Sequence, residues 1–407
     1  MPLKKETLEK EIQTRIKNVR NAMEKKKFEA LIVYGDNKIF GSLRYLTNYF
    51  PDRAGWISLG SKHTYLFEGA SLILPLEGDP VLLLDPGLIP TIDTTTRRVL
   101  AGSLSTRKGC GLSAESVVRI LKKSKIDSKA NVGIETWDRF PAPLYIRIAK
   151  MFSRVKFTKS TVVEEQRMIK SPLEITLFRE AGAVGDKAHS ILIQNLVNGI
   201  GKTELEIIRA TEHSMRTADP IYEDGCSCSP SLICSGLRNC EDASAMLHLP
   251  YNFKKIRRGD IVHWDICMRY CGYPIDTART KVIGDSNKLQ RHTFDAALDM
   301  HNRVLRSIRP GMKACDLVGI AEEAAKEMGY DLWMRFLGHG LGLDIHERPD
   351  MGMEETKLAA GMVLAIEPRI APNRKYIVGF EDMLLVTESG FESLTKYEKT
   401  FEIASKN

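Results

Sequence analysis

The chain has 407 residues, a net charge of +7 and a hydrophobic content of 43%. This length is typical of two domains, and the composition is that of a soluble globular protein. The positive charge is spread along the chain without an accompanying aromatic stripe, which disfavours a nucleic-acid partner. No uninterrupted apolar run reaches about 18 residues, so we expect no membrane span. The N-terminus lacks the apolar core of a signal peptide, and we expect a cytoplasmic protein.

Cysteine is the one residue type with an unusual count. There are eight cysteines, and six of them lie between Cys226 and Cys271. A zinc ribbon needs two C-x2-C pairs, which these spacings do not provide. We therefore expect reduced, partly buried thiols, with a cysteine-bound metal as the minor alternative. The role of the group from Cys226 to Cys240 stays open.

The first 160 residues predict an α/β domain. Residues 7–27 form an amphipathic helix by their spacing, because apolar side chains recur at three- and four-residue steps. Short apolar runs follow, separated by glycine, proline and aspartate. Two further helices are expected near residues 114–123 and 145–152.

A domain boundary is expected near residue 160, which divides the chain into residues 1–160 and 161–407. After it, a long helix begins at Pro172, where the missing N–H of proline has no partner to lose. The remaining elements are three helices and a set of C-terminal strands. The helices are expected over 204–217, 287–309 and 314–328, and the strands over 332–343, 362–370 and 383–389.

Two aspartates, Asp265 and Asp276, lie eleven residues apart in the segment VHWDICMRYCGYPIDTARTKV, residues 262–282. This segment predicts a strand, a tight turn and a second strand. A hairpin of that length brings its ends together, so both carboxylates can point into one site. Two hard anionic ligands on a rigid ribbon suit a divalent metal, and two solvated surface aspartates are the alternative.

The C-terminal part carries four further candidates. His339 and His346 lie in GHGLGLDIHERP, and the glycines beside His339 let the imidazole and the backbone approach a metal closely. Glu367 and Glu381 lie at the ends of apolar strands, where a buried carboxylate is costly unless a cation pairs with it. Asp382 should face the other way from Glu381 on a strand.

Four carboxylates and one imidazole would balance two divalent cations better than one. Such a set suits manganese, cobalt, iron or zinc better than a thiolate site would. A further histidine, His248, lies seventeen residues before Asp265 and is a candidate for the same site.

The order of these residues resembles a known family. The chain is similar to the "pita-bread" metallopeptidase superfamily in the order of its motifs. These are Asp265-x10-Asp276 followed by Thr-Ala-Arg-Thr, then GHGLGLDIHE, then IEP, and then ED before a hydrophobic strand. That superfamily includes Xaa-Pro dipeptidase (prolidase), aminopeptidase P, methionine aminopeptidase and creatinase. The resemblance spans most of residues 160–400, and RYLTNY at 44–49 is similar to a motif of the creatinase/prolidase N-terminal domain. It implies an α+β protein whose pita-bread C-terminal domain follows a smaller α/β creatinase-type N-terminal domain.

The resemblance also implies roles for individual residues. His248 and His346 would line the substrate cleft as proton donors or carbonyl-polarising groups, and Glu367 would take a proton from the attacking water. A homodimer is implied as well. The expected metals are two manganese or cobalt ions, with zinc or iron as alternatives. Five residues would hold them: Asp265, Asp276, His339, Glu367 and Glu381.

Three positions depart from the family pattern. Cys267 stands where members commonly have glycine in D-x-G, and we expect its thiol to share the face of Asp265 and to pack there. Arg369 stands where members commonly have the glycine of E-P-G. Gly379 stands where many Xaa-Pro enzymes have the arginine of R-I-E-D. Arg369 either supplies the cation that Gly379 lacks or forms a surface salt bridge.

The leading interpretation is metal-dependent hydrolysis of an amide C–N bond in a small peptide, by an Xaa-Pro dipeptidase or aminopeptidase. The alternative is an amidase, ring-opening hydrolase or lyase that acts on a small non-peptide amide. A third interpretation, a non-catalytic binding protein, is disfavoured because all five ligands are present.

Overall fold

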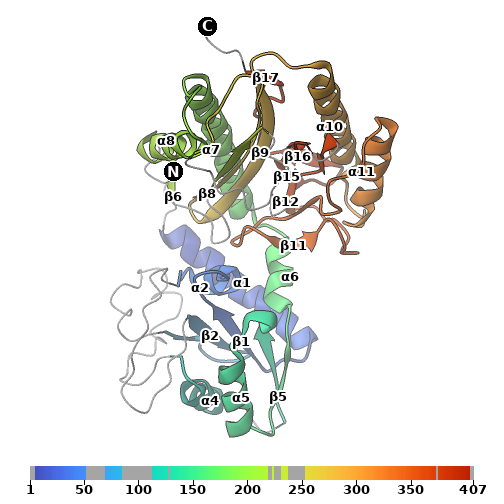
Figure 1. The fold of residues 1–407 in the computed structure, drawn as a ribbon. Helices are drawn as coiled ribbons and strands as arrows, with labels where there is room; N and C mark the ends of the chain where they lie inside the picture. Colours follow the sequence, from blue (N-terminus) through green and yellow to red (C-terminus); the bar gives the residue numbers. More distant parts are fainter. Residues whose placement is uncertain are drawn as a thin grey trace. The chain divides into compact units, whose positions relative to one another are not determined.

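The structure is a computed structural model that describes residues 5–51, 69–84, 112–126, 129–218, 222–223, 231–236, 253–372 and 375–403. It divides into two compact units, Met1–Arg167 and Met168–Asn407 (Figure 1). The domain boundary near residue 160 stays a prediction. The candidate His248 lies outside the described residues, as do Cys226, Cys228 and Cys240.

The first unit is built on a five-stranded sheet in the order β3–β2–β1–β4–β5. The central β1 pairs antiparallel with β2 and parallel with β4. The strands are β1 (Ala30–Gly35), β2 (Ala70–Pro75), β3 (Val81–Leu83), β4 (Asn131–Glu135) and β5 (Lys156–Lys159). The helices are α1 (Lys5–Lys25), α2 (Gly41–Thr47), α4 (Ala114–Lys123), the 3-10 turn η2 (Trp137–Arg139), α5 (Ala142–Met151) and α6 (Val162–Met168).

The predicted helices of this unit are present. In α1 the side chains of Ile12, Ile16, Val19 and Met23 are buried, as the periodicity of residues 7–27 predicts. Helix α4 begins where Ser113 accepts a hydrogen bond from the backbone N–H of Ser116, which caps a donor that the helix leaves unpaired. Apolar side chains of α4 and α5 share one core with β1 and β4.

Among the described residues, the second unit contains four helices and three sheets, one of which includes an extended hairpin. Its first helices are α7 (Pro172–Val197) and α8 (Glu204–Ala218). The strands β6 (Tyr222–Glu223), β7 (Leu232–Ser235), β8 (Ile261–Tyr270) and β9 (Tyr273–Ile283) follow, and then α10 (Lys288–Ser307) and α11 (Asp316–Glu327). The last strands are β10 (Gly338–Gly340), β11 (Glu347–Asp350), β12 (Val363–Ile366), β13 (Arg369–Ile370), β14 (Val378–Gly379), β15 (Asp382–Val386), β16 (Phe391–Ser393) and β17 (Glu402–Ile403).

Two sheets carry the residues of interest. One has the order β17–β9–β8–β6, with β7 also paired to β8, and the other has the order β11–β10–β12–β15–β16. Helix α7 packs against β8 and β9 (Figure 1). Helix α10 packs against α11 and β14. Pro172 begins α7 as predicted, and a capping box between Ser171 and Glu174 satisfies donors of its first turn.

The strand expected over residues 332–343 is much shorter than predicted. Only Gly338–Gly340 forms a strand, and turns or bends flank it. The glycines explain the difference, because they fit close backbone crossings that side chains would block and they do not favour extended pairing. From Leu337 on the segment is buried, whereas Leu332 to Phe336 are half-buried or exposed.

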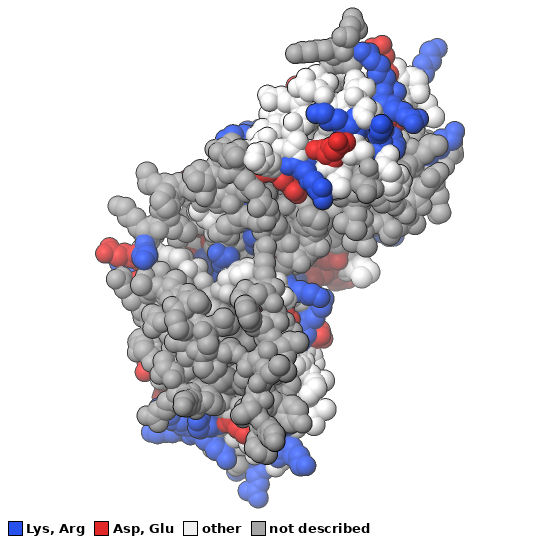
Figure 2. All heavy atoms as spheres, turned by 60° about the vertical axis from the view of Figure 1, so that its left-hand side comes forward, with Lys and Arg blue, Asp and Glu red and all other residues white. Residues whose placement is uncertain are grey.

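On the face in Figure 2, the blue side chains of lysine and arginine are interspersed with the red ones of aspartate and glutamate. Among the described helices, none combines the length and the apolar character that crossing a membrane requires.

Candidate metal centre

The hairpin of β8 and β9 brings its two aspartates to one face. The strands run antiparallel from Ile261 to Ile283, and the turn residues Cys271 and Gly272 both have positive φ, as in a type I′ turn. Cys267 is paired with Asp276 across the ladder, and Asp265 is paired with Ala278, two residues after Asp276. Side chains alternate along a strand, so Asp265, Cys267 and Asp276 share one face. The predicted hairpin is therefore confirmed.

Glu381 is fixed to this hairpin through its backbone. Its N–H donates a hydrogen bond of 2.9 Å to the carbonyl oxygen of Ala278, which places its side chain beside Asp276. The next residue, Asp382, points away and accepts hydrogen bonds from Arg279 (2.7 Å) and from His301 Nε2 (2.9 Å). The opposite orientation of Asp382 was predicted from strand alternation, and these contacts confirm it.

His339 reaches the cluster from β10, between two glycines whose small size is required. A Cβ on Gly338 would lie 2.0 Å from the carbonyl oxygen of Ala365, and one on Gly340 would lie 2.2 Å from that of Arg348. Gly338 also has a φ of +143°. The glycines therefore allow the neighbouring strands to come close enough to bring the imidazole to the carboxylates.

The imidazole of His339 has a defined orientation. Its Nδ1–H donates to the carbonyl oxygen of Gly340 at 3.1 Å, so in the neutral ring the lone pair of Nε2 points away from that bond. Nε2 lies 3.4 Å from Asp276 Oδ2, 3.9 Å from Glu367 Oε1 and 4.0 Å from Glu381 Oε1. A lone pair aimed at three carboxylates is unfavourable, and either a proton on Nε2 or a metal cation between these groups removes the repulsion.

Two buried atoms of this cluster lack hydrogen-bond partners among the described residues: His339 Nε2 and Glu381 Oε2. Buried polar atoms are normally paired, and unpaired ones call for an explanation such as an ion. The donors of three overlapping groups each lie within 4.8 Å of one another. These groups are Asp276, His339 and His346; Asp265, Cys267 and Asp276; and His339, Glu367 and Glu381.

The structure thus brings all five predicted ligands together, with His346 and Cys267 beside them. The ring of His346 lies edge-on to that of His339, with centroids 4.1 Å apart, and part of its side chain is exposed. The donor set of carboxylates and imidazole fits divalent metals of the first transition row.

Electrostatic repulsion is strong in the chain without metal. Burial, and then the charge of Asp276, raises the pKa of both Asp265 and Glu381 well above the usual range. Burial also raises the pKa of Glu367, even though Arg369 opposes the shift. Burial lowers the pKa of His339, but the nearby carboxylate of Asp276 outweighs it and the pKa is raised.

His346 behaves differently from His339. Its loss of solvent, together with the charge of His339, lowers its pKa to about 4. The ring is therefore neutral at neutral pH, with one nitrogen able to donate a hydrogen bond and the other able to accept one.

Arg369 lies in the cluster and not on the surface. Its Nη2 is 2.5 Å from Glu367 Oε2 and 3.9 Å from Asp265 Oδ2, and its side chain is 5% exposed. Burial alone would lower the pKa of Arg369, but the charges of Glu367 and Asp265 raise it above its usual value, so the guanidinium stays charged. Of the two predicted roles for Arg369, the internal cation is the one that the structure supports.

A buried chain of hydrogen bonds holds the backbone carbonyl of Glu381, and the sequence did not predict it. Trp264 Nε1–H donates to His189 Nδ1 at 2.9 Å, which leaves Nε2–H of His189 to donate to Thr277 Oγ1 at 3.1 Å. The hydroxyl of Thr277 donates to the carbonyl oxygen of Glu381 at 2.8 Å. Trp264 and Thr277 each neighbour a predicted ligand in the sequence, which is a signal. His189 lies on α7 without such a signal.

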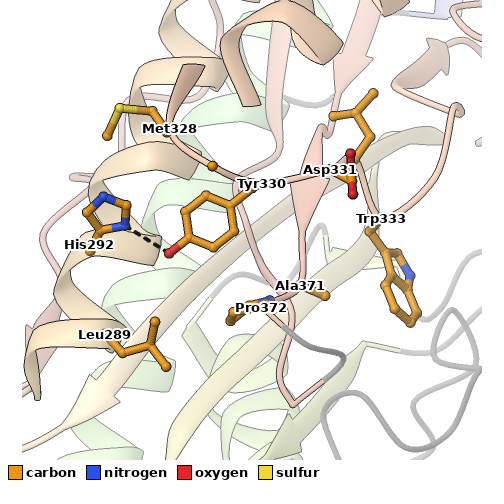
Figure 3. A pocket seen from close by; sticks show the side chains of 10 residues that line it. Leu289, His292, Met328, Tyr330, Asp331, Trp333, Ala371 and Pro372 are labelled. Carbon is orange, nitrogen blue, oxygen red and sulfur yellow. Dashed lines mark hydrogen bonds between the residues drawn. The ribbon is translucent and has the colours of Figure 1, made fainter. Parts of the chain in front are cut away.

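A separate pocket of about 770 Å³ lies between α10 and the chain that leads to Trp333 (Figure 3). Tyr330 lies at its centre, and its hydroxyl is 2.9 Å from His292 Nδ1 and 2.9 Å from Thr293 Oγ1. These polar groups satisfy one another, and Asp331 is the one carboxylate among the described residues of the lining. The pocket therefore lacks the donor set of the carboxylate cluster, which remains the candidate metal centre.

Comparison with known proteins gives a consistent result. The model of metallopeptidase family M24 matches residues 176–388, and that of the creatinase/prolidase N-terminal domain matches residues 15–169. The Xaa-Pro dipeptidase of Pyrococcus furiosus is 36% identical over 243 residues, which cover 58% of this chain and 66% of that protein. The Xaa-Pro dipeptidase of Pyrococcus horikoshii is 32% identical over 296 residues, which cover 70% and 80%.

Solved structures agree over nearly the whole chain. The prolidase from Pyrococcus horikoshii OT3 has a TM-score of 0.75 at 25% identity, covering 95% of this chain and 99% of its own. The prolidase from Pyrococcus furiosus has a TM-score of 0.71 at 26% identity, covering 93% and 99%.

Proposed function

Because the chain belongs to metallopeptidase family M24, we propose that it is a metal-dependent peptidase that cleaves the bond before proline in short peptides. Its fold is the predicted one, a pita-bread C-terminal domain preceded by a creatinase-type N-terminal domain. The P. furiosus relative matches over just under two thirds of its length, so the substrate is carried over as a proposal.

One observation carries this proposal: four separate segments converge on a buried centre in which His339 Nε2 and Glu381 Oε2 have no hydrogen-bond partner among the described residues. The five ligands proposed are Asp265, Asp276, His339, Glu367 and Glu381. Four carboxylates favour two divalent ions, and we propose manganese or cobalt, with zinc or iron as alternatives.

When bound, divalent cations polarise a substrate carbonyl and lower the pKa of a water molecule toward neutrality. The chain's own residues supply the remaining steps. Glu367 accepts the proton of the attacking water, and Arg369 holds this carboxylate through its bond to Oε2. His346, adjacent to His339 and partly exposed, donates a hydrogen bond to the carbonyl oxygen as negative charge develops there. His248, outside the described residues, stays a predicted donor to the leaving nitrogen.

The alternative of a small non-peptide amide rests on Arg369 and Gly379, two of the three positions near the cluster that depart from the peptidase pattern. A homodimer and a cytoplasmic location stay predictions from the sequence, and light scattering of the purified protein would test the first.

The test is a substrate panel with purified protein loaded with manganese or cobalt. Xaa-Pro dipeptides and tripeptides are compared with Xaa-Ala peptides of the same length. We expect cleavage of the proline peptides and little of the alanine ones, and loss of both in Asp276→Asn. A protein that binds metal and cleaves no member of the panel would contradict the peptidase proposal and favour the non-peptide amide.

A further inference from the structure

Cys267 points into the carboxylate cluster. Its Sγ lies 3.4 Å from Asp276 Oδ1 and 3.7 Å from Asp265 Oδ1, and the residue is 4% exposed. The register of the hairpin accounts for this position, because Cys267 directly faces Asp276 across the ladder and is two residues from Asp265 on the same strand. A thiol that only fills space would be expected among apolar side chains.

The two short contacts cannot both be hydrogen bonds at one time. A thiol has one proton and is a weak donor, so it can satisfy one of the two carboxylates. The second carboxyl group then faces the sulfur lone pairs, which compensate it poorly for its burial. A cation held jointly by the sulfur and the two carboxylates would satisfy all three groups.

An independent observation indicates a cation beside Asp276. His339 Nε2, which has no hydrogen-bond partner among the described residues, lies 3.4 Å from Asp276 Oδ2 on the other side of this carboxylate. The donor atoms of Asp265, Cys267 and Asp276 lie within 4.8 Å of one another, which is the spacing of ligands around one ion.

We propose that Cys267 supplies a sulfur ligand to the metal held by Asp265 and Asp276. The proposal deepens the proposed function, on which it rests for the presence of the metal. Sulfur binds as the thiolate, and its proton passes to the solvent as the bond to the metal forms. Thiolate is a soft ligand that favours zinc and cobalt over manganese, so this chain should prefer softer metals than an all-oxygen and nitrogen site would.

Absorption spectroscopy tests this proposal without relying on activity. Metal-free, full-length protein is titrated with cobalt(II), and bound cobalt is counted by elemental analysis. We expect the near-ultraviolet charge-transfer band of a thiolate–cobalt bond in the wild type. The band should disappear in Cys267→Ser while cobalt is still bound, and it should persist in Cys315→Ser, which removes a thiol at the start of α11.

Affinity gives a second readout. In Cys267→Ser and in Cys267→Gly, the preference for zinc over manganese should fall by about tenfold or more, a change typical of altered metal surroundings. Agreement of the two variants guards against a folding defect in one of them.

Two outcomes separate the sulfur ligand from the peptidase proposal. Cobalt that binds without the band, in a protein that cleaves Xaa-Pro peptides, overturns the sulfur ligand and leaves the proposed function intact. A band that depends on Cys267, in a protein that cleaves no Xaa-Pro peptide, supports the sulfur ligand and contradicts the peptidase proposal. A protein that binds none of cobalt, manganese, zinc and iron overturns both.

Discussion

Arg369 and Gly379 face each other across the β13–β14 pair, and the absence of a side chain at Gly379 makes room for the arginine. A Cβ on Gly379 would lie 2.6 Å from Arg369 Cγ and 3.0 Å from the carbonyl oxygen of Pro368. The resemblance to Xaa-Pro enzymes implies the reverse arrangement, with glycine at the first of these positions and arginine at the second. Relative to that pattern the two residue types are exchanged across the ladder, and Arg369 places its guanidinium at Glu367.

This exchange predicts a specific rescue. Arg369→Gly leaves Glu367 without its cation, and we expect kcat to fall by about 100-fold, as for a misplaced catalytic group. The double variant Arg369→Gly with Gly379→Arg should recover most of that loss, since directly paired residues of a ladder project to the same face. Steady-state kinetics on one Xaa-Pro dipeptide measures both. Equal activity of the single and double variants would show that the two positions are independent.

The hairpin and its ligands could be predicted because the information is local. The spacing of Asp265 and Asp276, and the Cys-Gly turn between them, specify a ladder that brings both carboxylates to one face. The glycines beside His339 likewise indicate, from their small size alone, that the backbone and the imidazole approach other groups closely. Such patterns depend on a few adjacent residues and on strand alternation alone.

Other features depend on contacts that no local pattern encodes. The position of Arg369 required the register of β13 and β14, which joins residues ten apart through a loop. The support of Glu381 by His189 requires α7 to pack on β8 and β9, a contact between residues far apart in the sequence. The sequence predicts that Cys267 is a packing thiol on the same face as Asp265, and the structure confirms the face. The contact of its sulfur with Asp276 is not predicted from the sequence.

The repulsion among the carboxylates predicts that Glu381→Gln changes the Tm in opposite directions in metal-free and metal-loaded protein. In metal-free protein, Glu381→Gln should raise the Tm by about 2–4 °C, the shift that about 1 kcal/mol produces in a domain of this size. The amide replaces a buried carboxyl group whose ionisation burial and the charge of Asp276 oppose, and it adds N–H donors. In metal-loaded protein the same substitution should lower the Tm, because a ligand is lost. Thermal unfolding with and without a chelator measures both, and a shift of the same sign in both states would argue against a cation at Glu381.

The close approach at β10 predicts an effect of side-chain size. Gly338→Ala should destabilise the protein by about 3 kcal/mol, since a Cβ would meet the backbone of Ala365 at a positive φ. Urea denaturation measures the change in the free energy of unfolding. The matched control is Gly319→Ala in α11, where an added Cβ would meet nothing within 4 Å. This substitution should stabilise the helix by up to about 1 kcal/mol. Similar effects at both glycines would contradict the steric account.

His189 predicts a dependence of stability on pH. Burial holds the pKa of His189 well below its usual value, so the folded chain leaves it neutral while the unfolded chain protonates it below about pH 6.5. Below that pH the unfolded state binds more protons, and stability should fall by about 1.4 kcal/mol per pH unit from this group.

His301 has a pKa lowered by burial as well and adds an effect of the same sign. The comparison with His189→Gln, made in metal-free protein, therefore isolates His189. Between pH 6.5 and 5, the free energy of unfolding of the variant should change less steeply with pH than that of the wild type. The difference in slope corresponds to one proton, about 1.4 kcal/mol per pH unit. Parallel curves for the two proteins would mean that His189 is not neutral in the folded state.

The central claim is that the carboxylates of the β8–β9 hairpin hold the metal, and the metal content of Asp276→Asn tests it most directly. Asp276 lies in two of the three candidate ligand groups and within reach of His339. Elemental analysis after cobalt loading and desalting should find about two equivalents in the wild type, as in dinuclear hydrolytic centres, and a clear loss in the variant. A folded Asp276→Asn variant that retains the wild-type cobalt content would contradict the account.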